Sequence, residues 1–259
     1  MSKYAWLLFL PVYLFVDPAW GETLQVPEDA PRWMHFGAAA LLFLHIGGGA
    51  IGIITGAVAS AAKKGQKLHR MSGRLFFGSM LLAYVIAAAV APFIAHGQRP
   101  NLVAGILALY LLLSGVSAAR RRNFKASYAE WLGLVAALFV TAMGAWFAYT
   151  AIQSEGGTFD GSPPQAFLVF VLTGLVAIVG EVRVLNRGEL SNVGRQERHP
   201  WRMCMSFFIA AGSLFFGQPQ VFPLWFNKSP LPDLLCAAPL IVMIYWLVKL
   251  KRVPAKQGA

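Results

Sequence analysis

Charged residues are scarce in this chain of 259 residues, because Asp, Glu, Lys and Arg together make up only 13% of it. A soluble domain usually has about 25% charged residues. Hydrophobic residues reach 57%, and the chain contains only two cysteines. This composition excludes a soluble globular protein and a disordered chain. The two cysteines exclude a small secreted scaffold held together by disulfides.

Motifs of the common enzyme classes are also missing. The sequence contains no HxxH, HExxH or CxxC pattern, which are the spacings typical of zinc sites. It contains no nucleophile with an attached base, no phosphate-binding loop and no pair of carboxylates that stands out. Hydrolytic and kinase-like chemistry therefore have no support in the sequence.

Long apolar runs are what the sequence has instead. A helix needs about 20 apolar residues to cross the roughly 30 Å hydrocarbon core of a bilayer. Seven windows meet or nearly meet this length, which predicts an all-α bundle of transmembrane helices: 33–60, 75–95, 102–119, 130–152, 166–185, 201–222 and 233–250. No linker is long enough to separate two domains, so we expect residues 22–259 to form a single transmembrane domain.

The basic residues indicate an orientation for these spans. If residue 1 lies inside and every span crosses once, 19 of the 22 Lys and Arg residues fall inside. The three outside are Arg32, Arg99 and Lys228. Lys and Arg concentrate in the cytoplasmic loops of membrane proteins. This predicts a multi-pass protein of a bacterial-type inner (plasma) membrane with a cytoplasmic C-terminus. The net charge of +11 then reflects loops that face anionic lipid, and we expect no nucleic-acid partner.

The N-terminal segment, residues 1–21, has two interpretations. Its apolar run covers only residues 4–16, follows Lys3 and precedes Ala19-Trp20-Gly21, which is typical of a secretory signal peptide with its cleavage site. A retained short helix that ends at Asp17-Pro18 explains the same residues. Both alternatives leave residues 22–32 outside, so the charge pattern does not separate them.

The first long span contains a stripe of glycines. Gly48, Gly52 and Gly56 recur every four residues, a spacing that lets two helices approach closely in lipid. His45 lies on the same helix face, near the centre of the bilayer. An ionisable residue at this depth is a functional-site hypothesis. The alternative is a neutral imidazole that bonds to a hydroxyl group at similar depth, from Tyr84, Tyr110, Thr141 or Thr173.

The other histidines form two pairs by depth. His35 and His96 lie at the outer ends of consecutive spans, whereas His69 and His199 each precede a span on the inner side. One pair near each surface is what two haem groups with two axial imidazoles each would require. Interfacial histidines that bind lipid head groups or cap helices are the alternative explanation.

Polar residues on the inner side form a second candidate site. We expect either a structural network of ion pairs or a pocket for a lipid head group, a quinone or a small anion. Its expected members are Arg70, Arg74, Glu130, Glu181, Arg183 and Arg202. Near the outer end of the sixth span, Pro219 is expected to break the helix, and Gln218 to satisfy the freed backbone groups. Broken helices of this kind form binding sites in transporters.

Two segments resemble a group of bacterial membrane proteins. Residues 61–80 read AAKKGQKLHRMSGRLFFGSM, a basic loop with H-R-x-x-G-R between a glycine-rich span and another apolar span. Residues 199–218 contain H-P-W-R-M and G-Q. Both are similar to the family called domain of unknown function 2306. The resemblance implies a polytopic membrane protein without an assigned activity. Its general look is similar to small b-type cytochromes, although here the paired histidines lie at the surfaces.

Three functional classes follow from these features. A b-type cytochrome would hold haem b between its helices and exchange electrons with a membrane quinone. A transporter, or a binder of lipids or small molecules, would use His45, the segment around Gln218 and the inner basic cluster. A scaffold would bind another membrane protein subunit through the glycine stripe. The first hypothesis makes the most specific prediction and is the one that the sequence favours.

Overall fold

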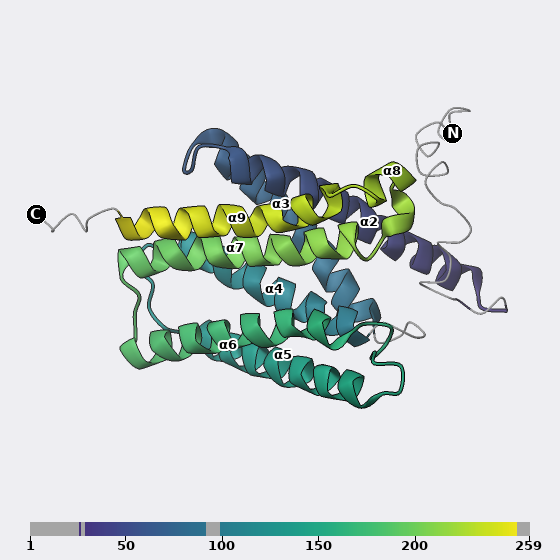
Figure 1. The fold of residues 1–259 in the computed structure, drawn as a ribbon. Helices are drawn as coiled ribbons and strands as arrows, with labels where there is room; N and C mark the ends of the chain where they lie inside the picture. The colour runs from purple at the N-terminus through teal and green to yellow at the C-terminus, as the bar shows by residue number, and fades with distance from the viewer. Residues whose placement is uncertain (1–25, 27–28, 92–98, 253–259) are drawn as a thin grey trace, which may run out of the picture.

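The structure is a computed structural model that describes residues 26, 29–91 and 99–252. Within these residues the chain forms long helices and no β-strand (Figure 1). The helices are α2 (Arg32–Ala61), α3 (Lys67–Val90), α4 (Arg99–Arg120), α5 (Tyr128–Gln153), α6 (Pro164–Arg187), α7 (Asn192–Phe215), the short α8 (Leu224–Asn227) and α9 (Leu231–Arg252). Six of them, α2 to α6 and α9, are long and apolar enough to cross a membrane. The prediction of an all-α, polytopic membrane protein is therefore confirmed. The segment 1–21 lies outside the described residues.

α7 is the long helix that differs most from its predicted span. The apolar window begins at residue 201, but the helix begins at Asn192, where the Ser191 hydroxyl accepts a hydrogen bond from Gly194 N at 3.1 Å. Its first turns carry arginines and a glutamate, so the helix does not reach the apolar content of the other six. A hydropathy window stops at such charges, whereas the helix continues because its charged side chains pack against neighbouring helices.

The long helices run in alternating directions (Figure 1). The last turn of α9 and three loops lie at one end of the bundle, which we call the basic end: 62–66, 121–127 and 188–191. Two of these loops are joined by main-chain hydrogen bonds, from Ala126 N to Gly188 O at 2.7 Å and from Leu190 N to Phe124 O at 2.9 Å. The contact between these loops brings the C-terminal end of α4 close to the start of α7.

α4 is the central helix, and α2 lies at the periphery. α4 packs against α3, α5 and α7 and buries ten of its residues. α2 buries only its three stripe glycines, and most of its large apolar side chains are exposed, with Trp33 73% exposed. A helix that exposes apolar side chains over most of its surface is suited to lipid and not to water.

The glycine stripe of α2 is the surface that α3 covers. A Cβ atom at Gly48 would lie 3.0 Å from the carbonyl oxygen of Ser79, and one at Gly52 would lie 2.3 Å from Met80 Cε. At Gly56 the closest atoms belong to the Phe76 ring, at 2.9 Å. The glycines therefore pack two helices of the same chain together. The face that the scaffold hypothesis assigns to another subunit is already occupied by α3.

The helix break near Pro219 is present. α7 ends at Phe215, a single 3-10 turn follows at Pro219–Val221, and the short α8 leads into α9. The expectation that Gln218 satisfies the freed carbonyls is wrong, because Asn227 Nδ2 donates to Pro219 O at 2.7 Å. The Gln218 side chain instead accepts a hydrogen bond from Gln220 Nε2. Asn227 reaches the break because α8 folds back towards it, which local sequence does not show.

Candidate functional site

Glu181 lies at the centre of a buried network of polar side chains. Arg198 Nη2 donates to both carboxylate oxygens of Glu181, at 2.8 and 2.7 Å. Arg202 Nη2 lies 3.0 Å from Oε1, and the Tyr110 hydroxyl donates to the same oxygen at 2.6 Å. Glu181 and Arg202 are 0% exposed. We call these four residues, from α4, α6 and α7, the arginine site.

Helix spacing and small residues create the arginine site. Arg198 and Arg202 lie four positions apart on α7 and therefore share one helix face. α5 contributes Gly133, where a Cβ atom would lie 2.8 Å from Glu181 Oε1 and 2.9 Å from the Tyr110 ring. The missing side chain at this position is what leaves room for the carboxylate between α5 and α7.

Aromatic rings and a hydroxyl surround the two guanidinium groups. The Arg202 guanidinium lies 5.0 Å from the ring centres of Tyr110 and of Trp201, and its Nη1 donates to Ser114 Oγ at 2.5 Å. The Arg198 guanidinium lies 5.4 Å from the centre of the Phe124 ring. Aromatic faces attract cations, so these contacts replace part of the water that the arginines lose on burial.

The arginine site has more positive than negative charge. Two guanidinium groups share one carboxylate, and Nε of both arginines is buried without a hydrogen-bond partner. The Nε–H and Nη2–H groups of an arginine point the same way and together fit two oxygens of one anion. Glu181 approaches Arg198 and Arg202 only through Nη2, and at Arg202 this 3.0 Å contact lacks hydrogen-bond geometry. Arg198 therefore keeps half of this donor pair unused, and Arg202 makes no hydrogen bond with either half of it.

Glu130 was expected in the same cluster but forms a separate one. It is buried at the start of α5, where its Oε1 accepts a hydrogen bond from Arg121 Nη1 at 2.9 Å. Its Oε2 accepts from the main-chain nitrogen of Ser127 at 2.8 Å, which completes a capping box. Glu130 therefore ties the start of α5 to the loop that follows α4, and it is not among the partners of the arginine site.

The three remaining predicted cluster members also lie elsewhere. Arg70 Nη1 donates to Gly65 O at 2.9 Å and is exposed. Arg74 and Arg183 are exposed. Arg183 follows Glu181 by two positions, and residues two apart on a helix point to different faces. The Arg183 side chain therefore points out of the bundle, whereas the Glu181 side chain points into it.

Sequence reasoning did not include Arg198 and Tyr110 among the cluster members. Arg198 precedes the apolar window that begins at residue 201, so the hydropathy pattern places it in a basic loop. Extension of the helical period towards the N-terminus would have placed Arg198 and Arg202 on one face. Tyr110 was considered only as a partner for His45, and nothing in its local sequence indicates Glu181.

Three histidines contact main-chain carbonyls through the same ring nitrogen. Nδ1 lies 3.0 Å from Ala83 O in His45, 3.0 Å from Ala59 O in His69 and 2.9 Å from Gly115 O in His199. Because a carbonyl only accepts, Nδ1 carries the proton in each case, and Nε2 is the nitrogen left to bind a proton or a metal.

His45 does not bond to any of the hydroxyl groups expected for it. The close approach of α2 and α3 at the glycine stripe instead brings the carbonyl of Ala83 to its ring. Of the outer pair, His35 is exposed on α2, and His96 lies outside the described residues. The pairing of these two residues stays a prediction.

His69 and His199 are brought together at the basic end. Their rings lie close enough to interact electrostatically, and Lys64 is a third member of this group. Lys64 Nζ donates to Ala59 O at 2.9 Å and lies 5.3 Å from the centre of the Trp246 ring. Partial burial lowers the pKa of Lys64. The inner pair of histidines therefore has a defined setting in the structure.

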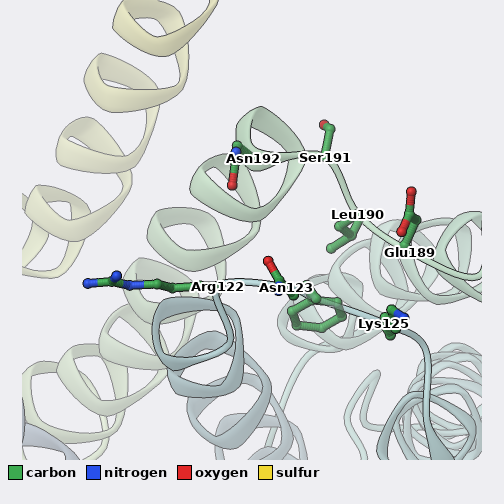
Figure 2. Close-up of a pocket in the computed structure, with 8 residues that line it drawn as sticks. Arg122, Asn123, Lys125, Glu189, Leu190, Ser191 and Asn192 are labelled. Atoms are coloured by element: carbon green, nitrogen blue, oxygen red, sulfur yellow. The ribbon is translucent and has the colours of Figure 1, made fainter. Parts of the chain in front are cut away.

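A pocket of about 270 Å³ lies between the two joined loops at the basic end (Figure 2). Its lining residues include the cations Arg122 and Lys125 and the acid Glu189. Phe124 also lines it, is 1% exposed, and has the Arg198 guanidinium 5.4 Å from its ring centre. The Phe124 side chain is therefore shared between the pocket and the surroundings of the arginine site.

Six helices long and apolar enough to cross a membrane, and a buried charged site between α4, α6 and α7, define a polytopic integral membrane protein. Comparison with protein-family models, with curated proteins and with solved structures finds no match for this chain.

Proposed function

We propose that this integral membrane protein binds a small anion at the arginine site, as a transporter or a membrane-embedded small-molecule binder. The observation that carries this proposal is the unused Nε donor on each of two buried arginines that share one carboxylate. Ionisable residues inside membrane proteins are expensive to bury and usually serve function. An anion with two oxygens would supply the acceptors that Arg198 and Arg202 lack.

We further propose that α7 is a seventh span. α7 packs against α4 and α9 and runs beside α9 in Figure 1. Arg198 and Arg202 are buried, so these charges are not presented to lipid. With seven spans, the loops rich in Lys and Arg lie on one side, which favours a cytoplasmic basic end, a cytoplasmic C-terminus and a bacterial inner membrane.

The charge of the basic end supports entry of an anion from that side. Arg122 and Lys125 flank the pocket there, beside a single acidic lining residue, Glu189. A surface with an excess of one charge raises the local concentration of the opposite ion. An anion that enters the pocket meets Phe124, and Arg198 lies next to the same ring.

Replacement of Arg198 or Arg202 by glutamine should weaken anion binding at least about tenfold, because each charged hydrogen bond contributes about 1.5–3 kcal/mol. The measurement is the rise in the thermal unfolding midpoint of the detergent-solubilised protein with formate, acetate or inorganic phosphate. Arg183→Gln is the matched control, because Arg183 is exposed two positions from Glu181. Equal responses of wild type, Arg198→Gln and Arg202→Gln would contradict the proposal.

A second candidate function is electron transfer through haem b, with a membrane quinone as the electron partner. The pair His69 and His199 favours it, because both imidazoles lie at the basic end and both keep Nε2 available. The two Nε2 atoms would hold the haem iron, and the carbonyls of Ala59 and Gly115 would orient the rings. When bound, haem supplies a centre that gains and loses one electron.

The haem proposal predicts a Soret band that shifts on reduction in protein purified from haem-replete cells. His69→Ala and His199→Ala should each remove the band or shift its position, because each variant loses one of the two imidazoles that would hold the iron. The spectrum of His35→Ala, which changes an exposed histidine, isolates the contribution of the inner pair. A colourless, iron-free preparation of the wild type would rule haem out.

A further inference from the structure

We infer that an anion binds the arginine site by taking the place of the Glu181 carboxylate, and that Glu181 takes up one proton in the same event. Anion and proton would then bind together. This inference rests on the proposed anion-binding function and deepens it, because it makes a proton the second ligand of the same site.

The unused donors explain why the anion displaces Glu181. Arg198 Nη2 donates to Glu181 while Nε, the other half of the same donor pair, has no partner. At Arg202 neither Nε nor Nη2 makes a hydrogen bond, although Glu181 Oε1 lies 3.0 Å from Nη2 and occupies that position. A ligand that uses both N–H groups of one arginine must therefore take the oxygen of Glu181 away from Nη2. It gains the Nε–H bond that Glu181 does not make.

The packing leaves no space for a ligand beside Glu181 on the α5 side. Glu181 is 0% exposed, and even a single carbon atom at Gly133 would lie 2.8 Å from its Oε1. Protein interiors of this density accept an added group only when another group moves. The carboxylate of Glu181 is the group that an anion can replace one for one.

The charges that face Glu181 explain the proton. α7 contributes Arg198 and Arg202, α4 contributes the Tyr110 hydroxyl, and α5 contributes only Gly133, which does not titrate. An anion on the two arginines would therefore leave a buried carboxylate without a cation and next to a second negative charge. Burial and a neighbouring like charge both favour the neutral form of a carboxyl group.

The exchange balances in atoms and charge. One anion and one proton enter from water, an O–H bond forms on the Glu181 carboxyl, and no other covalent bond changes. The site keeps the same net charge before and after, because one negative group replaces another on Arg198 and Arg202. The Tyr110 hydroxyl still has a carboxyl oxygen to which it donates.

Isothermal titration of the full-length protein with sodium formate tests this exchange. Formate stays ionised near neutral pH, so it does not supply the proton. Titrations in two buffers with different ionisation enthalpies should show about one proton taken up per formate bound, and the affinity should fall about tenfold for each unit rise in pH. Glu181→Gln should bind formate without proton uptake and without this pH dependence. Glu130→Gln, which changes a buried carboxylate paired with Arg121, should behave as the wild type.

The outcomes separate the inference from the function on which it rests. Formate binding by the wild type without proton uptake would overturn the exchange and leave the anion site in place. No formate or phosphate binding by the wild type or by Glu181→Gln would overturn the anion site itself. The two-buffer titration and the pH series on the wild type decide the question even if Glu181→Gln does not fold.

Discussion

Glu181→Leu is expected to lower the free energy of unfolding by about 3–5 kcal/mol, because it leaves two buried guanidinium groups without a counter-ion. Glu181 is the carboxylate that pairs with both Arg198 and Arg202. The loss is measurable as a lower unfolding midpoint of the detergent-solubilised protein, followed by circular dichroism. A variant as stable as the wild type would show that this network does not bear on stability.

A triple variant separates lost charge pairing from lost packing. Glu181→Leu combined with Arg198→Met and Arg202→Leu replaces the whole charged network by apolar side chains. Such replacements are often neutral or stabilising, because no buried charge is left to desolvate. We expect the triple variant to recover most of the stability lost in Glu181→Leu while it fails to bind formate. A triple variant no more stable than the single one would assign the loss to packing.

Gly52→Leu is expected to destabilise the contact between α2 and α3 by about 1–3 kcal/mol, because cores tolerate added atoms poorly. A Cβ atom at Gly52 would already lie 2.3 Å from Met80 Cε and 2.8 Å from Met80 Cγ. The further atoms of leucine must push Met80 aside or separate the helices. The unfolding midpoint measures the effect.

Gly49→Leu is the matched control on the same helix. Nothing lies within 4 Å of a Cβ atom at Gly49, so its side chain would face outwards and the midpoint should stay near that of the wild type. Met80→Ala in the Gly52→Leu background should restore part of the loss, because it removes the atoms that collide. Equal effects of leucine at positions 49 and 52 would show that the stripe is not a packing surface.

The pattern of apolar residues was sufficient to predict the long helices, but it did not predict the charged first turns of α7. Apolar runs predicted each long helix, since a span through lipid must be long and apolar over its own length. The same reasoning placed the start of α7 nine residues late, because the missed turns carry charged residues such as Arg198, which only the neighbouring helices bury. The resemblance of residues 61–80 to the domain of unknown function 2306 family stays a prediction.

The amino-acid sequence alone defines an all-α membrane protein, the difference in charge between its two ends, and a stripe of glycines suited to helix packing. The tertiary structure decides which charges meet. Tyr110 and Glu181 meet although they are 71 positions apart in the sequence. Glu130 pairs with Arg121, although Glu130 and Glu181 were expected in one cluster. The physical reason is that apolar periodicity is a property of each helix, whereas an ion pair between helices depends on their relative rotation and depth. Only the packed bundle sets those two quantities.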